Sequence, residues 1–171
     1  MCRSKNIRFA ATNYLGRQHY FVTICCFNRS KIFAAGNRCW WFLELLRSEC
    51  ATRNFDVHAY CLMPDHVHLL TQGLERTSDL LNLMKSVKLK TSRTYARQTG
   101  EILWQRKFYD HILRPKESPE SVAWYIWSNP VRKGLSPTVY TYPFNGSFTL
   151  CIPKTETPPA TWLPPWRKQP M

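Results

Sequence analysis

The sequence predicts an α+β domain built around an antiparallel sheet. Short segments rich in aromatic and β-branched residues, which favour strands, alternate with longer segments whose apolar residues recur at helical spacing. Their order is strand, helix, strand, strand, helix, strand, followed by one more helix. A chain of 171 residues is long enough for one such domain with a tail at each end.

The first strand is expected over residues 18–27, where aromatic and β-branched residues crowd together before the polar run Asn28-Arg29-Ser30. A helix should follow over residues 37–51, with Asn37 as its N-cap, because its apolar residues recur at helical spacing. This pair supplies the first strand and the first covering helix of the domain.

Two further strands are predicted over residues 55–63 and 66–72, joined by a tight turn. A longer helix should then start at Thr77 or Ser78, either of which can cap it, and end near Arg97. The two strands are close in sequence, so we expect them to pair as antiparallel neighbours.

The last predicted strand covers residues 108–114, and the last helix begins after Ser118. Pro119 then occupies the first helical position and Glu120 the first turn, where the helix dipole favours an acid. The resulting βαββαβ order suits a ferredoxin-like sheet with two helices on one face, which many RNA-recognition modules also have. The added helix must then cover the other face or lie beside a strand.

The composition divides the chain into an N-terminal arm (1–16), a domain (17–150) and a C-terminal tail (151–171). Six of the twelve prolines fall between Pro153 and Met171, so we expect an extended tail, although Trp162 and Trp166 could anchor it to the domain.

The charge of the chain indicates an anionic partner. Lys and Arg number 24 against 11 Asp and Glu, which leaves a net charge of +13 and a pI near 9.7, as in nucleic-acid-binding proteins. No run of eighteen apolar residues and no secretory leader is visible, so we expect no membrane association. The seven cysteines are odd in number and include no Cys-x-x-Cys pair, which favours reduced thiols and a cytoplasmic location.

The strongest candidate site is the motif His66-Val67-His68 on the third predicted strand. Side chains alternate across a strand, so His66 and His68 share one face, and two imidazoles from one rigid strand could bind a metal ion. An exposed edge or a hydrogen-bonded core is the alternative. Zinc hydrolases and cupins also carry this spacing, so the motif alone names no reaction.

Three sequence blocks resemble one known family. They are Met63-Pro64-Asp65-His66-Val67-His68-Leu69-Leu70, Leu103-Trp104-Gln105-Arg106-Lys107-Phe108-Tyr109-Asp110-His111 and Tyr125-Ile126-Trp127-Ser128-Asn129-Pro130-Val131-Arg132-Lys133-Gly134-Leu135. In this order and spacing they resemble the REP-associated tyrosine transposases, which belong to the single-tyrosine HUH endonucleases. The segment 142–148 resembles the closing segment of that family, so the resemblance spans residues 17–148.

The resemblance implies an HUH-type fold in which the added helix carries a tyrosine nucleophile, Tyr125. His66 and His68 would bind a divalent metal, expected to be Mg²⁺ or Mn²⁺, and Asn129, one helical turn after Tyr125, could add an amide oxygen. The implied reaction is nicking and joining of single-stranded DNA through a covalent 5′-phosphotyrosine. Seven other tyrosines are rival nucleophiles: Tyr14, Tyr20, Tyr60, Tyr95, Tyr109, Tyr140 and Tyr142.

The implied substrate is a hairpin from a repetitive extragenic palindrome (REP), and we expect a monomer, with a dimer as the alternative. Residues able to contact DNA lie in three groups. The second helix carries basic residues and no acid, so these residues form either a solvated face or a surface that binds phosphates. An aromatic and basic segment follows this helix, and two basic residues come after the nucleophile helix. They are Lys85, Lys88, Lys90, Arg93 and Arg97; Trp104, Arg106 and Lys107; and Arg132 and Lys133. Trp104 could equally belong to the core.

Two other functions remain open at this stage. A non-catalytic module could bind single-stranded nucleic acid on its sheet with structural histidines, and it would bind without metal. A metal-dependent hydrolase could activate water at the histidine pair, and it would turn over without a protein adduct.

Overall fold

The computed structural model describes residues 14–149 and 162–164. Its centre is a five-stranded antiparallel sheet with the strand order β4-β1-β3-β2-β5. The strands are β1 (His19–Cys25), β2 (Phe55–Met63), β3 (His66–Gly73), β4 (Tyr109–Ile112) and β5 (Asn145–Gly146). The predicted α+β, ferredoxin-like fold with an added helix is confirmed, and the short edge strand β5 is new.

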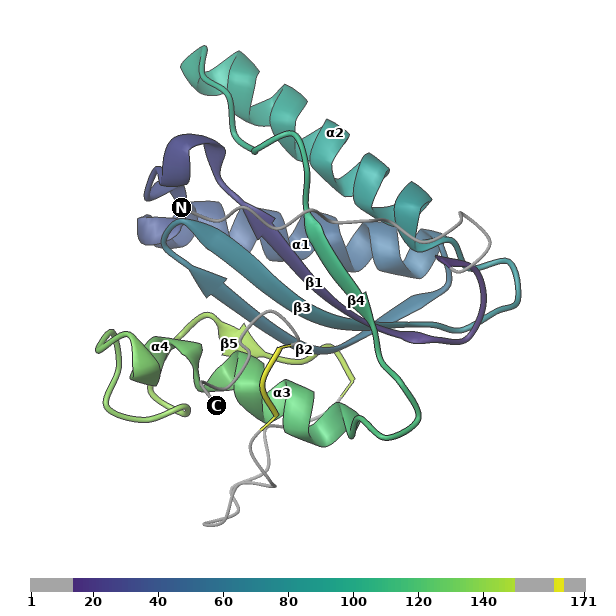
Figure 1. The fold of residues 1–171 in the computed structure, drawn as a ribbon. Coiled ribbons are helices and arrows are strands. Elements are labelled where there is room, and N and C mark those ends of the chain that lie inside the picture. Colours follow the sequence, from purple (N-terminus) through teal and green to yellow (C-terminus); the bar gives the residue numbers. More distant parts are fainter. Residues whose placement is uncertain (1–13, 150–161, 165–171) are drawn as a thin grey trace.

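Helices cover both faces of this sheet. They are α1 (Gly36–Thr52), α2 (Leu80–Thr99), α3 (Pro119–Trp127) and α4 (Asn129–Arg132), together with the 3-10 turns η2 (Phe27–Arg29) and η3 (Ile32–Ala34). Figure 1 shows α1 and α2 on one face and α3 on the other, near β2 and β3. The added helix therefore covers the second face.

The central strands are buried on both sides, and their alternation builds two cores. On β1, Tyr20, Val22 and Ile24 face α1 and α2, whereas Phe21 faces α3. The histidines of β3 lie on the same face as Phe21, because the register pairs Thr23 with His68. A polar group on this covered face is costly unless it has a hydrogen-bond partner or a bound ion.

Two predicted helix caps were wrong. Helix α1 begins at Gly36, so Asn37 lies inside its first turn and does not cap it. Asp79 caps α2 by accepting from the Asn82 N–H, while the Ser78 hydroxyl donates to the backbone of Asn54. The predicted cap of α3 is confirmed, since the Ser118 side chain accepts from the N–H of the third residue of α3.

Trp104, for which the sequence left base stacking and a core position open, lies in the core between the sheet and its helices. Its side chain is 5% exposed and packs against the rings of Phe33 and Phe42. Its indole N–H donates to Thr91 Oγ1 on α2 at 2.7 Å. A buried indole with its one donor used is unable to stack a base, so Trp104 leaves the set of DNA contacts.

The two predicted tails lie largely outside the described residues, and both meet the domain where they are described. Tyr14, assigned to the N-terminal arm, is 1% exposed, and its hydroxyl donates to Asp110 on β4 at 2.6 Å. Trp162, assigned to the extended tail, is 9% exposed and belongs to the α3 core. Across 14–149 and 162–164, the structure has no helix long and apolar enough to cross a membrane.

Candidate active site

The imidazoles of His66 and His68 converge at the start of β3. Their Nε2 atoms are 3.1 Å apart. The Nδ1 atom of His66 lies 2.5 Å from Asp65 Oδ1, and that of His68 lies 2.8 Å from Thr23 Oγ1 on β1. Each ring is therefore held by a hydrogen bond at Nδ1, and the two Nε2 atoms point toward each other.

This arrangement suits metal binding. A carboxylate only accepts hydrogen bonds, so Asp65 keeps the His66 proton on Nδ1 and leaves Nε2 as a lone-pair donor. Two nitrogens that bind one ion at about 2.1 Å and at right angles lie about 3.0 Å apart, close to the observed separation. Within the described residues, no cluster of three or more His, Cys, Asp or Glu side chains could hold a metal ion.

Asp65 links this pair to the end of β1. Its hydrogen bond with His66 lowers the pKa of the Asp65 carboxyl, partial burial opposes this effect, and the charge of Arg29 acts in the same direction as the hydrogen bond. Arg29 Nη1 lies 3.4 Å from Asp65 Oδ2. The carboxylate therefore stays ionised and can orient the imidazole of His66.

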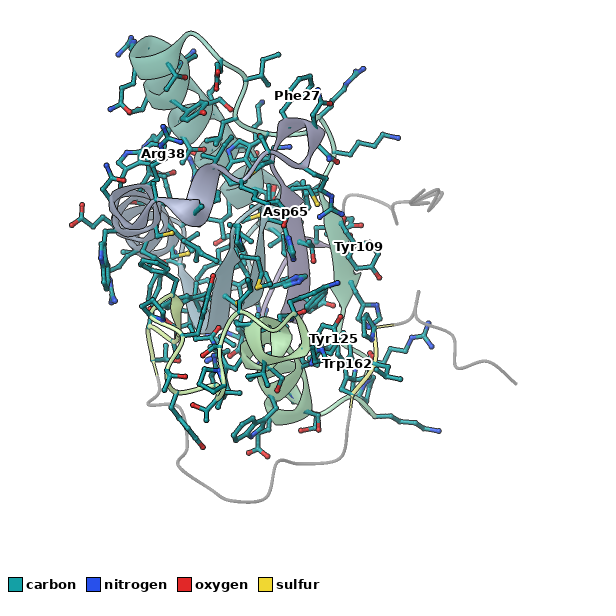
Figure 2. The ribbon with its side chains drawn as sticks, turned by 90° about the vertical axis from the view of Figure 1, so that its left-hand side faces the viewer. Phe27, Arg38, Asp65, Tyr109, Tyr125 and Trp162 are labelled. Atoms are coloured by element: carbon teal, nitrogen blue, oxygen red, sulfur yellow. The ribbon has the colours of Figure 1, made fainter. Side chains whose placement is uncertain are left out.

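Helix α3 brings Tyr125 to the same place. The side chain is 6% exposed, and its ring centroid is 6.4 Å from that of His68. The rings of Phe21 on β1 and Trp162 lie 6.0 and 5.2 Å away, and Figure 2 shows Tyr125 and Trp162 side by side at α3. The predicted nucleophile and a predicted metal ligand thus meet within one chain.

Three rival tyrosines have hydroxyls occupied elsewhere. Besides the bond from Tyr14 to β4, the hydroxyl of Tyr95 donates to Glu101 at 3.0 Å, and that of Tyr142 donates to a carbonyl of β2 at 2.8 Å. Burial raises the pKa of Tyr142 and that of Tyr109 well above the ordinary value. These contacts identify structural roles for Tyr14, Tyr95 and Tyr142.

Asn129 and Pro130 form the break between α3 and α4. Pro130 has no N–H, so the carbonyl of Ile126 loses its usual helical donor. The Asn129 side chain replaces it: Nδ2 donates to the carbonyls of Tyr125 (2.9 Å) and Ile126 (3.2 Å). The amide nitrogen is thereby directed at the helix, which leaves Oδ1 as the atom that could bind a metal ion.

The basic residues of α2 lie in the layer opposite α3 (Figure 1), and two of the five have partners inside the protein. Lys88 Nζ donates to the carbonyls of Gln105 and Arg106 at 2.7 and 2.9 Å, and Lys90 pairs with Glu49 on α1. Lys88 therefore helps to hold the segment that follows α2, and its contact with DNA stays a prediction. Lys85, Arg93 and Arg97 are exposed.

The other basic residues lie nearer the histidine pair. Arg106 and Lys107 are exposed on the segment between α2 and β4, beside the end of β1, because the Gln105 N–H donates to the Cys25 carbonyl. Lys133, which ends α4, is also exposed. Arg132 lies over the ring of Tyr125, with Cζ 4.3 Å from the ring centroid.

Sequence reasoning missed two residues of this site. Asp65 stands next to His66 in the sequence, so its carboxylate could have been proposed as a partner from adjacency alone. Thr23 could not, because its contact with His68 depends on the register of β1 with β3. Both residues hold a ring in place.

Comparisons with known proteins identify the family of this chain. The sequence profile described as "Transposase IS200 like" matches residues 15–129. A protein of Haemophilus influenzae described as a REP-associated tyrosine transposase is 27% identical over 156 residues, covering 84% of this chain and 86% of its own. The REP-associated tyrosine transposase of Escherichia coli is 25% identical over 93 residues, 54% of each chain.

A solved structure of a REP-associated tyrosine transposase bound to a REP hairpin has the same fold. It matches with a TM-score of 0.69 at 22% identity and covers 83% of this chain and 81% of its own. The profile match spans most of the domain, including the histidine pair and Tyr125. The chain therefore belongs to the IS200-like transposase family, as a tyrosine transposase.

Proposed function

We propose that this protein nicks and rejoins single-stranded DNA, with Tyr125 as the nucleophile and a divalent metal ion held by His66, His68 and Asn129. The observation that carries the proposal is the position of the Tyr125 ring, 6.4 Å from that of His68, whose Nε2 lies 3.1 Å from that of His66. A nucleophile beside two oriented metal ligands is what transfer of a phosphoryl group requires.

The proposed step exchanges one phosphodiester for another. The phenolic oxygen of Tyr125 attacks phosphorus and its proton passes to water, while the bond to the 3′ oxygen breaks and that oxygen leaves as a hydroxyl. The 5′ phosphate remains on Tyr125 as an ester, so the 3′-hydroxyl can reverse the reaction and join the ends. Because the bond energy is kept in the ester, no nucleotide cofactor is needed.

The donor set favours Mg²⁺ or Mn²⁺. Two imidazoles are borderline ligands that suit Mn²⁺ better than Mg²⁺, the amide oxygen is a hard ligand that suits either ion, and Mg²⁺ is the more abundant ion in cells. When bound, the ion supplies Lewis-acid polarisation of the phosphate and stabilises the charge that develops in the transition state. Thr23 and Asp65 hold the two rings in position for it.

The proposed substrate is a hairpin of REP type with single-stranded flanks, as in the structural relative bound to a REP hairpin. The net charge of +13 supports an anionic partner, and the proposed location is the bacterial cytoplasm, at the nucleoid. Tyr125 and His68 come from the same chain, so the site needs no second copy, which supports a monomer.

The test incubates an end-labelled hairpin oligonucleotide with the full-length protein and Mn²⁺ or Mg²⁺, and measures a protein–DNA band that survives denaturation. Wild type should form the band only with metal. Tyr125→Phe, His66→Ala and His68→Ala should each abolish it. Tyr140→Phe is the matched control, because Tyr140 is 48% exposed, and it should behave as wild type.

Two outcomes would contradict the proposal. An adduct formed by Tyr125→Phe would exclude Tyr125 as the nucleophile. Repeated cleavage of the hairpin without any adduct would indicate a hydrolase that uses water.

The variant Asn129→Ala, which removes the amide oxygen, tests the third ligand. It should raise the metal concentration required for half-maximal adduct formation, and an unchanged requirement would show that Asn129 is not a ligand.

A further inference from the structure

We propose that the turn η2 is a base-binding site, in which Phe27 stacks an unpaired base of the DNA strand next to the cleavage site. This inference rests on the proposed function, because it takes single-stranded DNA as the substrate. It gives Phe27 and its basic neighbours a role in choosing which nucleotides enter the histidine site.

The side chain of Phe27 is presented to solvent by the turn η2. Phe27 is 41% exposed at the end of β1. Ile102, which precedes Leu103 on the neighbouring segment, is 61% exposed. The Phe27 N–H donates to the Leu103 carbonyl at 2.9 Å, so the two exposed apolar residues come from adjoining segments. One exposed phenylalanine is ordinary, but here the segment bonded to it also exposes an apolar residue.

The backbone of this turn is held in an uncommon conformation. Asn28 and Arg29 both have positive φ, 49° and 57°, although neither is glycine. Three hydrogen bonds maintain the turn: the Arg29 N–H donates to the Cys26 carbonyl, and the N–H and hydroxyl of Ser30 donate to the Phe27 carbonyl. Strain of this kind persists where surrounding contacts enforce it, and it is concentrated at functional sites.

Four basic residues come from the same two segments as Phe27 and Ile102. Arg29 and Lys31 follow Phe27 along the chain, and Arg106 and Lys107 lie on the segment paired with the end of β1; all four are exposed. Aromatic rings among Lys and Arg are the usual means by which proteins bind single strands, because the ring stacks a base while the cations hold phosphates. Asp65 contacts Arg29 at 3.4 Å, and the Arg29 side chain is half exposed, so a phosphate can compete for its guanidinium.

The turn is joined directly to the histidine site. The Cys26 N–H donates to the Asp65 carbonyl at 2.9 Å, and the Asp65 carboxylate bonds both Arg29 and His66. Figure 2 shows Asp65 between Phe27 and Tyr125. Phe27 is two residues beyond Cys25, the partner of His66, or roughly 7 Å along the chain at about 3.3 Å per residue. A base stacked on Phe27 would thus lie within a short stretch of the phosphate attacked by Tyr125.

The experiment measures binding without chemistry. A hairpin oligonucleotide with single-stranded flanks is made in versions with one abasic position each, and Kd is measured by fluorescence anisotropy with chelator present. In wild type, one flank position should lose about tenfold in affinity when its base is removed. In Phe27→Ala that position should carry no penalty, and the intact hairpin should bind about tenfold more weakly.

Two variants control for other causes. Phe27→Trp keeps a stacking surface and should preserve the wild-type abasic profile, while Trp40→Ala removes an aromatic residue that is 57% exposed on α1 and should also preserve it. An identical abasic profile in Phe27→Ala and wild type would overturn the proposal. Failure of Tyr125 to form an adduct would leave this binding profile intact, so the two proposals fail independently.

Discussion

The guanidinium of Arg132 lies over the ring of Tyr125, with Cζ 4.3 Å from the ring centroid, and its Nη2 donates to the Tyr125 carbonyl at 2.9 Å. The first contact places a positive charge beside the phenol, and the second ties α4 to the end of α3. In the proposed reaction, negative charge develops on the phenolic oxygen and on the phosphate. The guanidinium of Arg132 is close enough to stabilise that charge.

Arg132→Ala should slow adduct formation by about tenfold to a hundredfold at saturating DNA, because the transition state loses a nearby cation. Single-turnover rates of adduct formation at saturating DNA measure this effect. Lys133→Ala removes an exposed neighbouring charge and should leave the rate within about twofold. Equal rates for Arg132→Ala and wild type would contradict this role.

Thr23→Val should weaken metal binding while leaving the fold intact. Valine has nearly the same shape as threonine but lacks the hydroxyl that bonds His68 Nδ1. Loss of such a supporting bond typically lowers metal affinity by about tenfold to a hundredfold. The Mn²⁺ concentration for half-maximal adduct measures this, and Thr23→Ser, which keeps the hydroxyl, should retain the wild-type value. A requirement for Mn²⁺ unchanged in Thr23→Val would show that the bond does not support the metal site.

Gly73→Ala should destabilise the fold by roughly 1–3 kcal/mol, as overpacking does. A Cβ at Gly73 would lie 2.1 Å from the carbonyl oxygen of Gly16 and 2.8 Å from Ser78 Cβ, so backbone must move. Gly100→Ala is the comparison, because nothing lies within 4 Å of a Cβ added at Gly100. Only the left-handed φ of +75° disfavours alanine there, which should cost about 1 kcal/mol of stability. Urea unfolding compares the two, and a smaller loss at Gly73 than at Gly100 would refute the predicted clash.

Glu49 should make the stability of the fold depend on acid. Burial opposes its ionisation, but hydrogen bonds from Lys90, Ser86 and Arg53 outweigh burial and lower the pKa of Glu49 below its ordinary 4.5. A carboxyl with a lowered folded-state pKa stabilises the protein fully above pH 4.5, and this contribution is lost as pH falls through the folded-state value.

Glu49→Gln should therefore be less stable than wild type at pH 7, by about 1–3 kcal/mol, and the difference should shrink below pH 4.5. Unfolding free energies measured across pH 3–7 test this. The control variant is Asp56→Asn, which removes a carboxyl from a different element, β2. A difference that stays constant with pH would show that Glu49 is not the group responsible.

Much of the fold followed from local pattern. The bounds of β2 and the cap of α3 were predicted, because strand alternation and helix capping depend on residues close in the sequence. The ends of α1 and α2 were misplaced, since several residues there could cap and the choice among them depends on tertiary contacts such as that of Ser78 with Asn54.

The sequence by itself determined that His66 and His68 share a face of one strand, and that Asn129 lies one turn after Tyr125. Both relationships follow from backbone periods of two and about four residues. Tertiary structure alone decided that Tyr125 meets His68, that Thr23 holds the ring of His68, and that Trp104 is buried. The physical reason is that contacts between elements depend on which face of the sheet each helix covers, and burial summed over the whole chain decides that choice.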